Sequence, residues 1–183
     1  MVVPADLIKL VLPVSSKSQY MTFKNLILLL STVSTALIGG LFYAYSCSVL
    51  PGLTRLSDLS FLQAMQSINR AILNPLFFAS FMGTLILLPI SVWFFKEQGT
   101  VFYLLLAAAL LYFSGVFLVT VIGNVPLNDL LDGTDLAKLN AEELTALRNK
   151  FEPGWNLFHR IRTIVSFICI VLTAYAAILS RNA

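Results

Sequence analysis

Side chains able to bind or transform a small molecule are grouped at the ends of three apolar segments. They are Asn69, Arg70, Asn74, Asn124, Asn128, Trp155, His159 and Arg162. Arginine and asparagine donate hydrogen bonds to a negatively charged oxygen, and a neutral histidine accepts a proton. We therefore assign candidate catalytic roles to His159 and Arg162, and candidate substrate-binding roles to the other six residues.

The spacing of these residues predicts that they share helix faces. Residues three or four positions apart lie on the same side of a helix. Arg70 with Asn74 and Asn124 with Asn128 have this spacing, and so does the series Trp155, His159 and Arg162. Three helices are therefore expected to aim amide, imidazole or guanidinium groups at one end of a bundle.

Structural roles remain open for several of these residues. Asn74-Pro75 is typical of a helix start, in which Asn is the N-cap and Pro takes the first helical position. Gly123 to Asp129 has the composition of a helix end, and Trp155 could be an interfacial anchor. If the residues form a site, Arg162 should point into the bundle and hydrogen-bond to an Asn side chain or to a carbonyl freed near Pro126. Asn124 is the favoured partner, because Pro126 lacks an N–H and opens the helix end there.

The sequence predicts neither a metal centre nor a bound cofactor. The chain has one histidine, and its acidic residues lie outside the apolar segments, so a transition metal would find too few ligands. Cys47 and Cys169 do not form a C-x-x-C pair, which argues against dithiol redox chemistry. No glycine-rich phosphate loop is present.

The elements that must position these residues are membrane-spanning helices. The 183 residues are 58% hydrophobic and 11% charged, whereas soluble domains carry roughly 25% charged residues, so a soluble enzyme is excluded. Long uncharged, continuously apolar stretches predict helices near 25–48, 75–95, 100–123 and 158–180. We expect an all-α membrane protein, in which residues 25–180 form an antiparallel bundle of four transmembrane helices.

The segments outside these four helices carry weaker signals. Residues 1–24 are interpreted as an N-terminal extension, a surface segment or disordered, and 181–183 as a tail. Between the third and fourth spans, Asn140-Ala141-Glu142-Glu143 is a capping-box pattern. It predicts a short amphipathic helix there, which Pro153-Gly154 should end.

Charge and location suggest the partners. A net charge of +3 without a basic block argues against nucleic acid, whereas membrane lipids and a hydrophobic aromatic small molecule fit the composition. A homo-oligomer is left open. We expect a multi-pass protein of the bacterial cytoplasmic (inner) membrane, with both termini cytoplasmic.

Three motifs resemble a known family. They are Ile68-Asn69-Arg70-Ala71-Ile72-Leu73-Asn74-Pro75, Gly123-Asn124-Val125-Pro126-Leu127-Asn128-Asp129, and Trp155 followed by Arg162-Thr163. In this order they resemble the bacterial membrane family DUF1772, which is grouped with the anthrone oxygenases, over roughly Leu26 to Leu179. Where this chain has His159, the family pattern usually has an asparagine, so the resemblance does not imply a base role for His159.

The resemblance implies four transmembrane helices and, for some relatives, oxygenation of anthrones to anthraquinones without metal or flavin. The first hypothesis is therefore a cofactor-free oxygenase acting on a lipophilic, enolisable aromatic. The alternative is a non-catalytic membrane protein that binds lipid or a small molecule, or that serves as a partner subunit.

Overall fold

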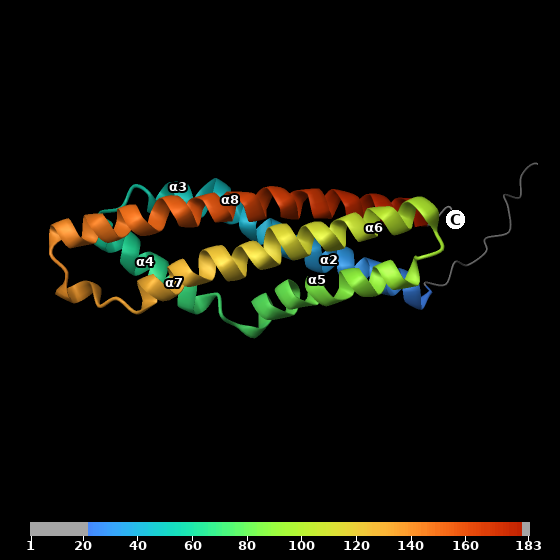
Figure 1. Cartoon of the computed structure of the whole chain (residues 1–183), viewed down its shortest axis with the longest axis horizontal. Helices are drawn as coiled ribbons and strands as arrows, with labels where there is room; N and C mark the ends of the chain where they lie inside the picture. The colour runs from blue at the N-terminus through green and yellow to red at the C-terminus, as the bar shows by residue number, and fades with distance from the viewer. Residues whose placement is uncertain (1–21, 181–183) are drawn as a thin grey trace, which may run out of the picture.

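A computed structural model describes residues 22–180, and all regular structure in this range is helical (Figure 1). The predictions for residues 1–21 and 181–183 lie outside the described residues. Four helical rods are long and apolar enough to cross a membrane: Phe23–Leu53, Pro75–Phe94, Gly99–Asp132 and Ala141–Ser180. The chain is an all-α integral membrane protein, as predicted.

Two of these rods are built from several helical segments. The first consists of α2 (Phe23–Ala44), the π-helix η1 (Tyr45–Val49) and α3 (Leu50–Leu53). The third consists of α6 (Gly99–Leu111), the π-helices η2 (Tyr112–Leu118) and η3 (Thr120–Asn124), and α7 (Val125–Asp132). The second rod is α5 (Pro75–Phe94) and the fourth is α8 (Ala141–Ser180).

Prolines account for two of the π-helical turns. Pro51 and Pro126 each follow a π-helix by two residues and lie in the first turn of the next α-helical segment. A proline lacks the N–H that would bond the carbonyl four residues back, and its ring crowds that carbonyl. A local change from i→i−4 to i→i−5 bonding relieves this crowding, and such turns are frequent at functional sites.

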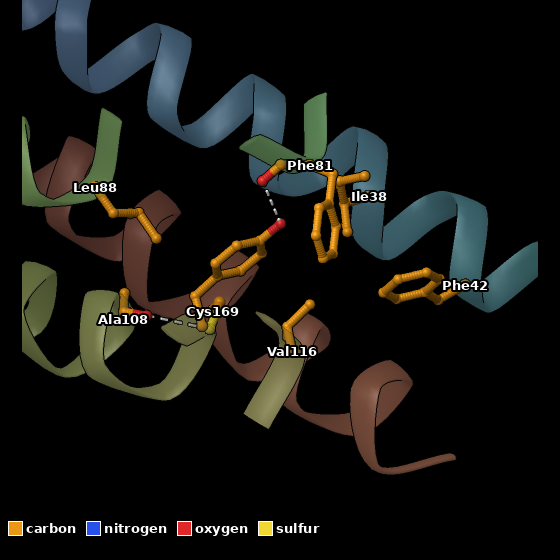
Figure 2. Packing of buried hydrophobic residues seen from close by; sticks show 8 residues of the cluster. Ile38, Phe42, Phe81, Leu88, Ala108, Val116 and Cys169 are labelled. Carbon is orange, nitrogen blue, oxygen red and sulfur yellow. Dashed lines mark hydrogen bonds between the residues drawn. The ribbon is translucent and has the colours of Figure 1, made fainter. Parts of the chain in front are cut away.

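The four rods pack as a square in which each contacts two neighbours. α2 packs against α5 and α8, and α6 packs against the same two helices. Ile38, Phe81 and Val116 converge from three helices in the core between them (Figure 2). The buried hydroxyl of Tyr112 donates to the carbonyl oxygen of Phe81 at 2.9 Å, which satisfies a polar group in an apolar interior.

The helix α4 (Asp58–Ala71) lies in the first connection and was not predicted. Its N-cap is Ser57, and Phe61, Leu62 and Met65 are fully buried at helical spacing. These side chains pack against Leu131 and Phe151 at one end of the bundle. Figure 1 shows α4, α7 and the first turns of α8 together at this end, far from the C-terminus. We call this group the end cap.

The predicted separate amphipathic helix is the beginning of α8. Asn140 and Glu143 form the predicted capping box, with N–H to side-chain oxygen distances of 2.8 and 3.0 Å. The prediction that Pro153-Gly154 ends the helix was wrong, because α8 continues to Ser180. Phe151 and Trp155 on either side of Pro153 are buried in one cluster, and this packing offsets the lost backbone bond. The remaining short helix is η4 (Leu136–Lys138).

Candidate functional site

A cavity of about 360 Å³ lies where the four rods meet the end cap. Its walls are largely aromatic and come from all four rods: Phe42, Tyr45, Phe77, Phe78, Phe81, Phe117 and Trp155. Five polar residues also line it: Asn69, Thr120, Asn128, His159 and Arg162. Phe42 and Phe81 belong both to this wall and to the core in Figure 2, so the cavity continues the core of the bundle. A cavity of this character suits an apolar molecule with a polar end.

Among residues 22–180, Arg162 is the only charged residue that lines the cavity. Its side chain is only 6% exposed. One terminal nitrogen donates to Thr120 Oγ1 at 3.2 Å, the other to His159 Nδ1 at 3.3 Å, and Nε has no partner. The guanidinium also lies over the ring of Phe42, 4.6 Å from its centre. Among residues 22–180 no carboxylate pairs with Arg162. The cavity therefore holds an uncompensated positive charge.

His159 is held in one tautomer by its two neighbours. A guanidinium can only donate, so Nδ1 accepts from Arg162 and the ring proton lies on Nε2. Nε2 then donates to Ser46 Oγ at 2.9 Å, and Ser46 lies 3.2 Å from Thr163 Oγ1. Thr163 in turn donates to the carbonyl oxygen of His159. The basic nitrogen of the imidazole therefore faces Arg162.

Trp155 stacks on His159 and completes the shared face of α8. Their ring centres are 5.1 Å apart with an angle of 17° between the planes. The indole N–H donates to Asn128 Oδ1 at 2.8 Å. Trp155, His159 and Arg162 are all buried on one side of α8, as their spacing predicted.

Two of the asparagines predicted for the site, Asn69 and Asn124, have a buried polar atom without a partner among the described residues. Asn69 on α4 lines the cavity, and its Nδ2 has no hydrogen bond. Asn124 donates to the carbonyl oxygen of Trp155 at 3.3 Å, and its Oδ1 is unpartnered. Buried polar groups are normally satisfied. Asn69 Nδ2 and Arg162 Nε are therefore two hydrogen-bond donors of lining residues that have no acceptor in the described structure.

The structure does not bring Arg70 and Asn74 to the cavity. Arg70 is exposed and pairs with Asp132. Asn74 caps α5, with Oδ1 accepting from the N–H of Phe77 at 3.1 Å. The prediction that they share a helix face was wrong, because α4 ends at Ala71 and α5 begins at Pro75. Asn74 is the N-cap of α5, as its structural interpretation predicted.

The predicted bond between Arg162 and Asn124 is also absent, although Arg162 points into the bundle as expected. Thr120 takes the place of Asn124, because the third rod continues as a helix through Pro126 and does not open there. Sequence reasoning missed Thr120, Ser46, Tyr45 and Phe42. Thr120 precedes Asn124 by four residues, and this spacing was a usable signal. The other three lie in an apolar span without a comparable motif.

Comparison with protein families identifies the chain. The family model described as anthrone oxygenase matches residues 64–172, which is more than half of the chain. This range covers most of α4, all of α5 to α7 and the α8 face that carries Trp155, His159 and Arg162. No curated protein and no solved structure is similar enough to be matched. The chain belongs to the anthrone oxygenase family.

Proposed function

We propose that the cavity binds a lipophilic, enolisable aromatic molecule and promotes its reaction with oxygen without a cofactor. The observation that carries the proposal is Arg162, a buried cation with a free N–H in the wall of an apolar cavity. Such a group stabilises negative charge that develops on a bound oxygen far more in a water-poor site than in water. The family to which the chain belongs supports the same chemistry.

The reaction requires removal of a proton from an acidic carbon. In an anthrone, this carbon is the ring CH₂, and its electron pair moves to the carbonyl oxygen to give an enolate. Arg162 Nε and Asn69 Nδ2 supply donors for this oxygen. The electron-rich carbon then reacts with dioxygen, and loss of water gives the quinone. Overall, CH₂ and O₂ become C=O and H₂O.

His159 accepts the proton in this proposal. His159 Nδ1 accepts from Nη2 of Arg162, so it becomes free to act as a base when the guanidinium turns and Nη2, beside Nε, also donates to the substrate oxygen. Ser46 keeps the ring in place by accepting from Nε2. Among the described residues, no acidic side chain lines the cavity. His159 is therefore the lining residue that can accept the proton.

The test is oxidation of anthrone by the purified protein in lipid nanodiscs under air. The wild type should form anthraquinone faster than empty nanodiscs, and Arg162→Gln should lose about 100-fold of this acceleration. Arg160→Gln is the matched control, because Arg160 lies two residues away on the exposed side of α8. No acceleration by the wild type with several anthrones would overturn the proposal.

The alternative is a protein that binds such a molecule without transforming it. It is favoured by the bond from Arg162 to His159 Nδ1, which occupies the basic nitrogen in the unliganded cavity. Under this alternative, Arg162→Gln weakens binding and lowers the melting temperature, and no variant changes the rate of quinone formation.

We further place the protein in the bacterial inner membrane with both termini cytoplasmic. The end cap and the cavity would then lie toward the periplasmic side. Membrane lipids and the aromatic molecule are the proposed partners.

A further inference from the structure

The cavity has a rim that is both exposed and apolar. Six lining residues have at least 36% of their surface exposed. They are Leu41, Leu73, Phe78, Met82, Val121 and Val125. The polar groups lie deeper, since Asn69, His159 and Arg162 are each less than 9% exposed. Every exposed lining residue is hydrophobic, so the opening has an apolar entrance and a polar interior.

The rim lies along the side of the bundle. Phe78 and Met82 belong to α5, and Val121 and Val125 to the third rod, both of which are membrane spans. α5 packs along α6 and reaches η2, but it has no comparable packing with η3 or α7. Figure 1 likewise shows the first turns of α5 apart from α7. The two spans therefore diverge beside the cavity.

We propose that the cavity fills sideways from the lipid bilayer, between the first turns of α5 and the η3–α7 segment. The ligand is a flat aromatic dissolved in the hydrocarbon layer that enters with an electron-rich oxygen leading. The ligand class rests on the proposed function, whereas the route rests on the rim.

The chemistry of rim and interior favours this route over entry from water. Exposing a continuous apolar rim to water is unfavourable, whereas lipid chains solvate it as well as protein does. A lipophilic aromatic is also far more concentrated in the bilayer than in water. The unpartnered donors on Asn69 and Arg162 then attract the oxygen to the closed end. The rim admits the ring system and the interior orients it.

The test uses Trp155 as a reporter of cavity occupancy. Trp93→Phe leaves Trp155 as the only tryptophan, and Trp93 lies outside the cavity lining. 1-Hydroxyanthraquinone is mixed with proteoliposomes in a stopped-flow instrument. The rate at which it quenches the fluorescence of Trp155 is recorded. Val121→Phe with Val125→Phe should slow the quenching of Trp155 fluorescence by about one decade. Met82→Ala, which widens the rim, should accelerate it.

Ile122→Phe is the matched control. Ile122 is 71% exposed beside Val121 but does not line the cavity, so its replacement should leave the rate within twofold of the parent rate. Lateral entry would be overturned if quenching were complete and its rate equal in three proteins: the parent, Val121→Phe/Val125→Phe and Met82→Ala. The proposed function would not be affected by this result. Absence of quenching in the parent protein would overturn both. Unchanged melting temperatures show that a slower rate is not a folding defect.

Discussion

At the residue scale, the burial of Arg162 within the bundle is the feature that most needs an explanation. A charged side chain at membrane depth is costly on every scale of insertion. The structure offsets this cost with two hydrogen bonds and with the rings of Phe42 and Trp155, whose centres lie 4.6 and 5.7 Å from the guanidinium carbon. Nε remains unpartnered. This incomplete compensation is typical of a binding group and not of a structural link.

Ser46 is a positioning residue for His159 in the proposed reaction. Ser46→Ala removes the nearer acceptor of the Nε2 proton and leaves only Thr163 Oγ1 at 3.5 Å, so the ring is held less firmly. We expect kcat for anthrone oxidation to fall by about tenfold, as for other partners of functional histidines, with KM unchanged because Ser46 does not line the cavity. Steady-state kinetics in nanodiscs measures both constants.

The matched control for this variant is Ser48→Ala. Ser48 lies in the same π-helix as Ser46 but is exposed, so kcat should not change. Ser46→Thr retains the hydroxyl and should restore most of the activity. A loss of kcat in the Ala variant that Thr does not restore would contradict the positioning role.

At the element scale, the third rod lies close enough to α8 to need glycine at the contact. A Cβ atom at Gly123 would lie 2.6 Å from the first ring carbon of Phe158, and one at Gly115 would lie 2.8 Å from a methyl group of Val165. This close approach places Thr120 within reach of Arg162. The glycines therefore help to assemble the site without lining it.

Gly123→Ala should destabilise the bundle by about 1–3 kcal/mol, because the ring of Phe158 must shift within a packed interface. Gly40→Ala is the control, because a Cβ atom there meets nothing within 4 Å. In that open helical position Ala should be neutral or stabilising by about 0.5–1 kcal/mol. Thermal melting in detergent compares the two. Equal melting temperatures would show that the contact between the third rod and α8 is looser than described.

Within the end cap, Asp58 links α4 to the first turns of α8. Its carboxylate accepts from Thr145 Oγ1 at 2.6 Å and from Arg148 at 3.0 Å. Arg148 also donates to the carbonyl oxygens of Leu56 and Thr54, which precede α4. The hydrogen bond from Thr145, followed by that from Arg148, holds the pKa of Asp58 below its ordinary value of 3.8.

This lowered pKa predicts a dependence of stability on pH. The stabilisation by Asp58 is complete above its ordinary pKa and is lost as the pH falls through the lower pKa of the folded state. Melting temperatures between about pH 5 and about pH 2 should fall less steeply in Asp58→Asn than in the wild type. Lys138→Gln is a control, because the pair of Lys138 with Asp135 is widely exposed. Parallel curves for the wild type and Asp58→Asn would contradict this account.

At the scale of the whole molecule, four crossings put the turn between α5 and α6 on the opposite membrane face from the end cap. In a Cys47→Ser background, Glu97→Cys lies in that turn and Ala137→Cys lies in η4, and both positions are exposed. The remaining cysteine, Cys169, is fully buried. A membrane-impermeant maleimide applied to intact spheroplasts should label position 137 and spare position 97. The reverse pattern would invert the proposed orientation, and labelling of both would contradict four crossings.

The sequence by itself determined the features that depend on neighbours along the chain. Uncharged apolar runs predicted the membrane helices, because a charged residue in hydrocarbon is costly wherever the rest of the chain lies. The caps at Asn74 and Asn140 are likewise local, since each side chain bonds a backbone N–H three residues on. The shared face of Trp155, His159 and Arg162 follows from helical geometry.

The tertiary structure decided which of these faces meet. Arg70 and Asn74 have the spacing of a shared face, but Arg70 belongs to α4 and Asn74 caps α5, and the packing of α4 turns Arg70 away from the cavity toward Asp132. Pro153 is a local stop signal that the burial of Phe151 and Trp155 overrides. Arg162 donates to Thr120 because Gly123 lets the third rod approach α8 closely. The distance between two helices depends on the volumes of side chains from separate segments of the chain. Local rules therefore place the functional groups on helices, and close packing between helices selects those that form the cavity.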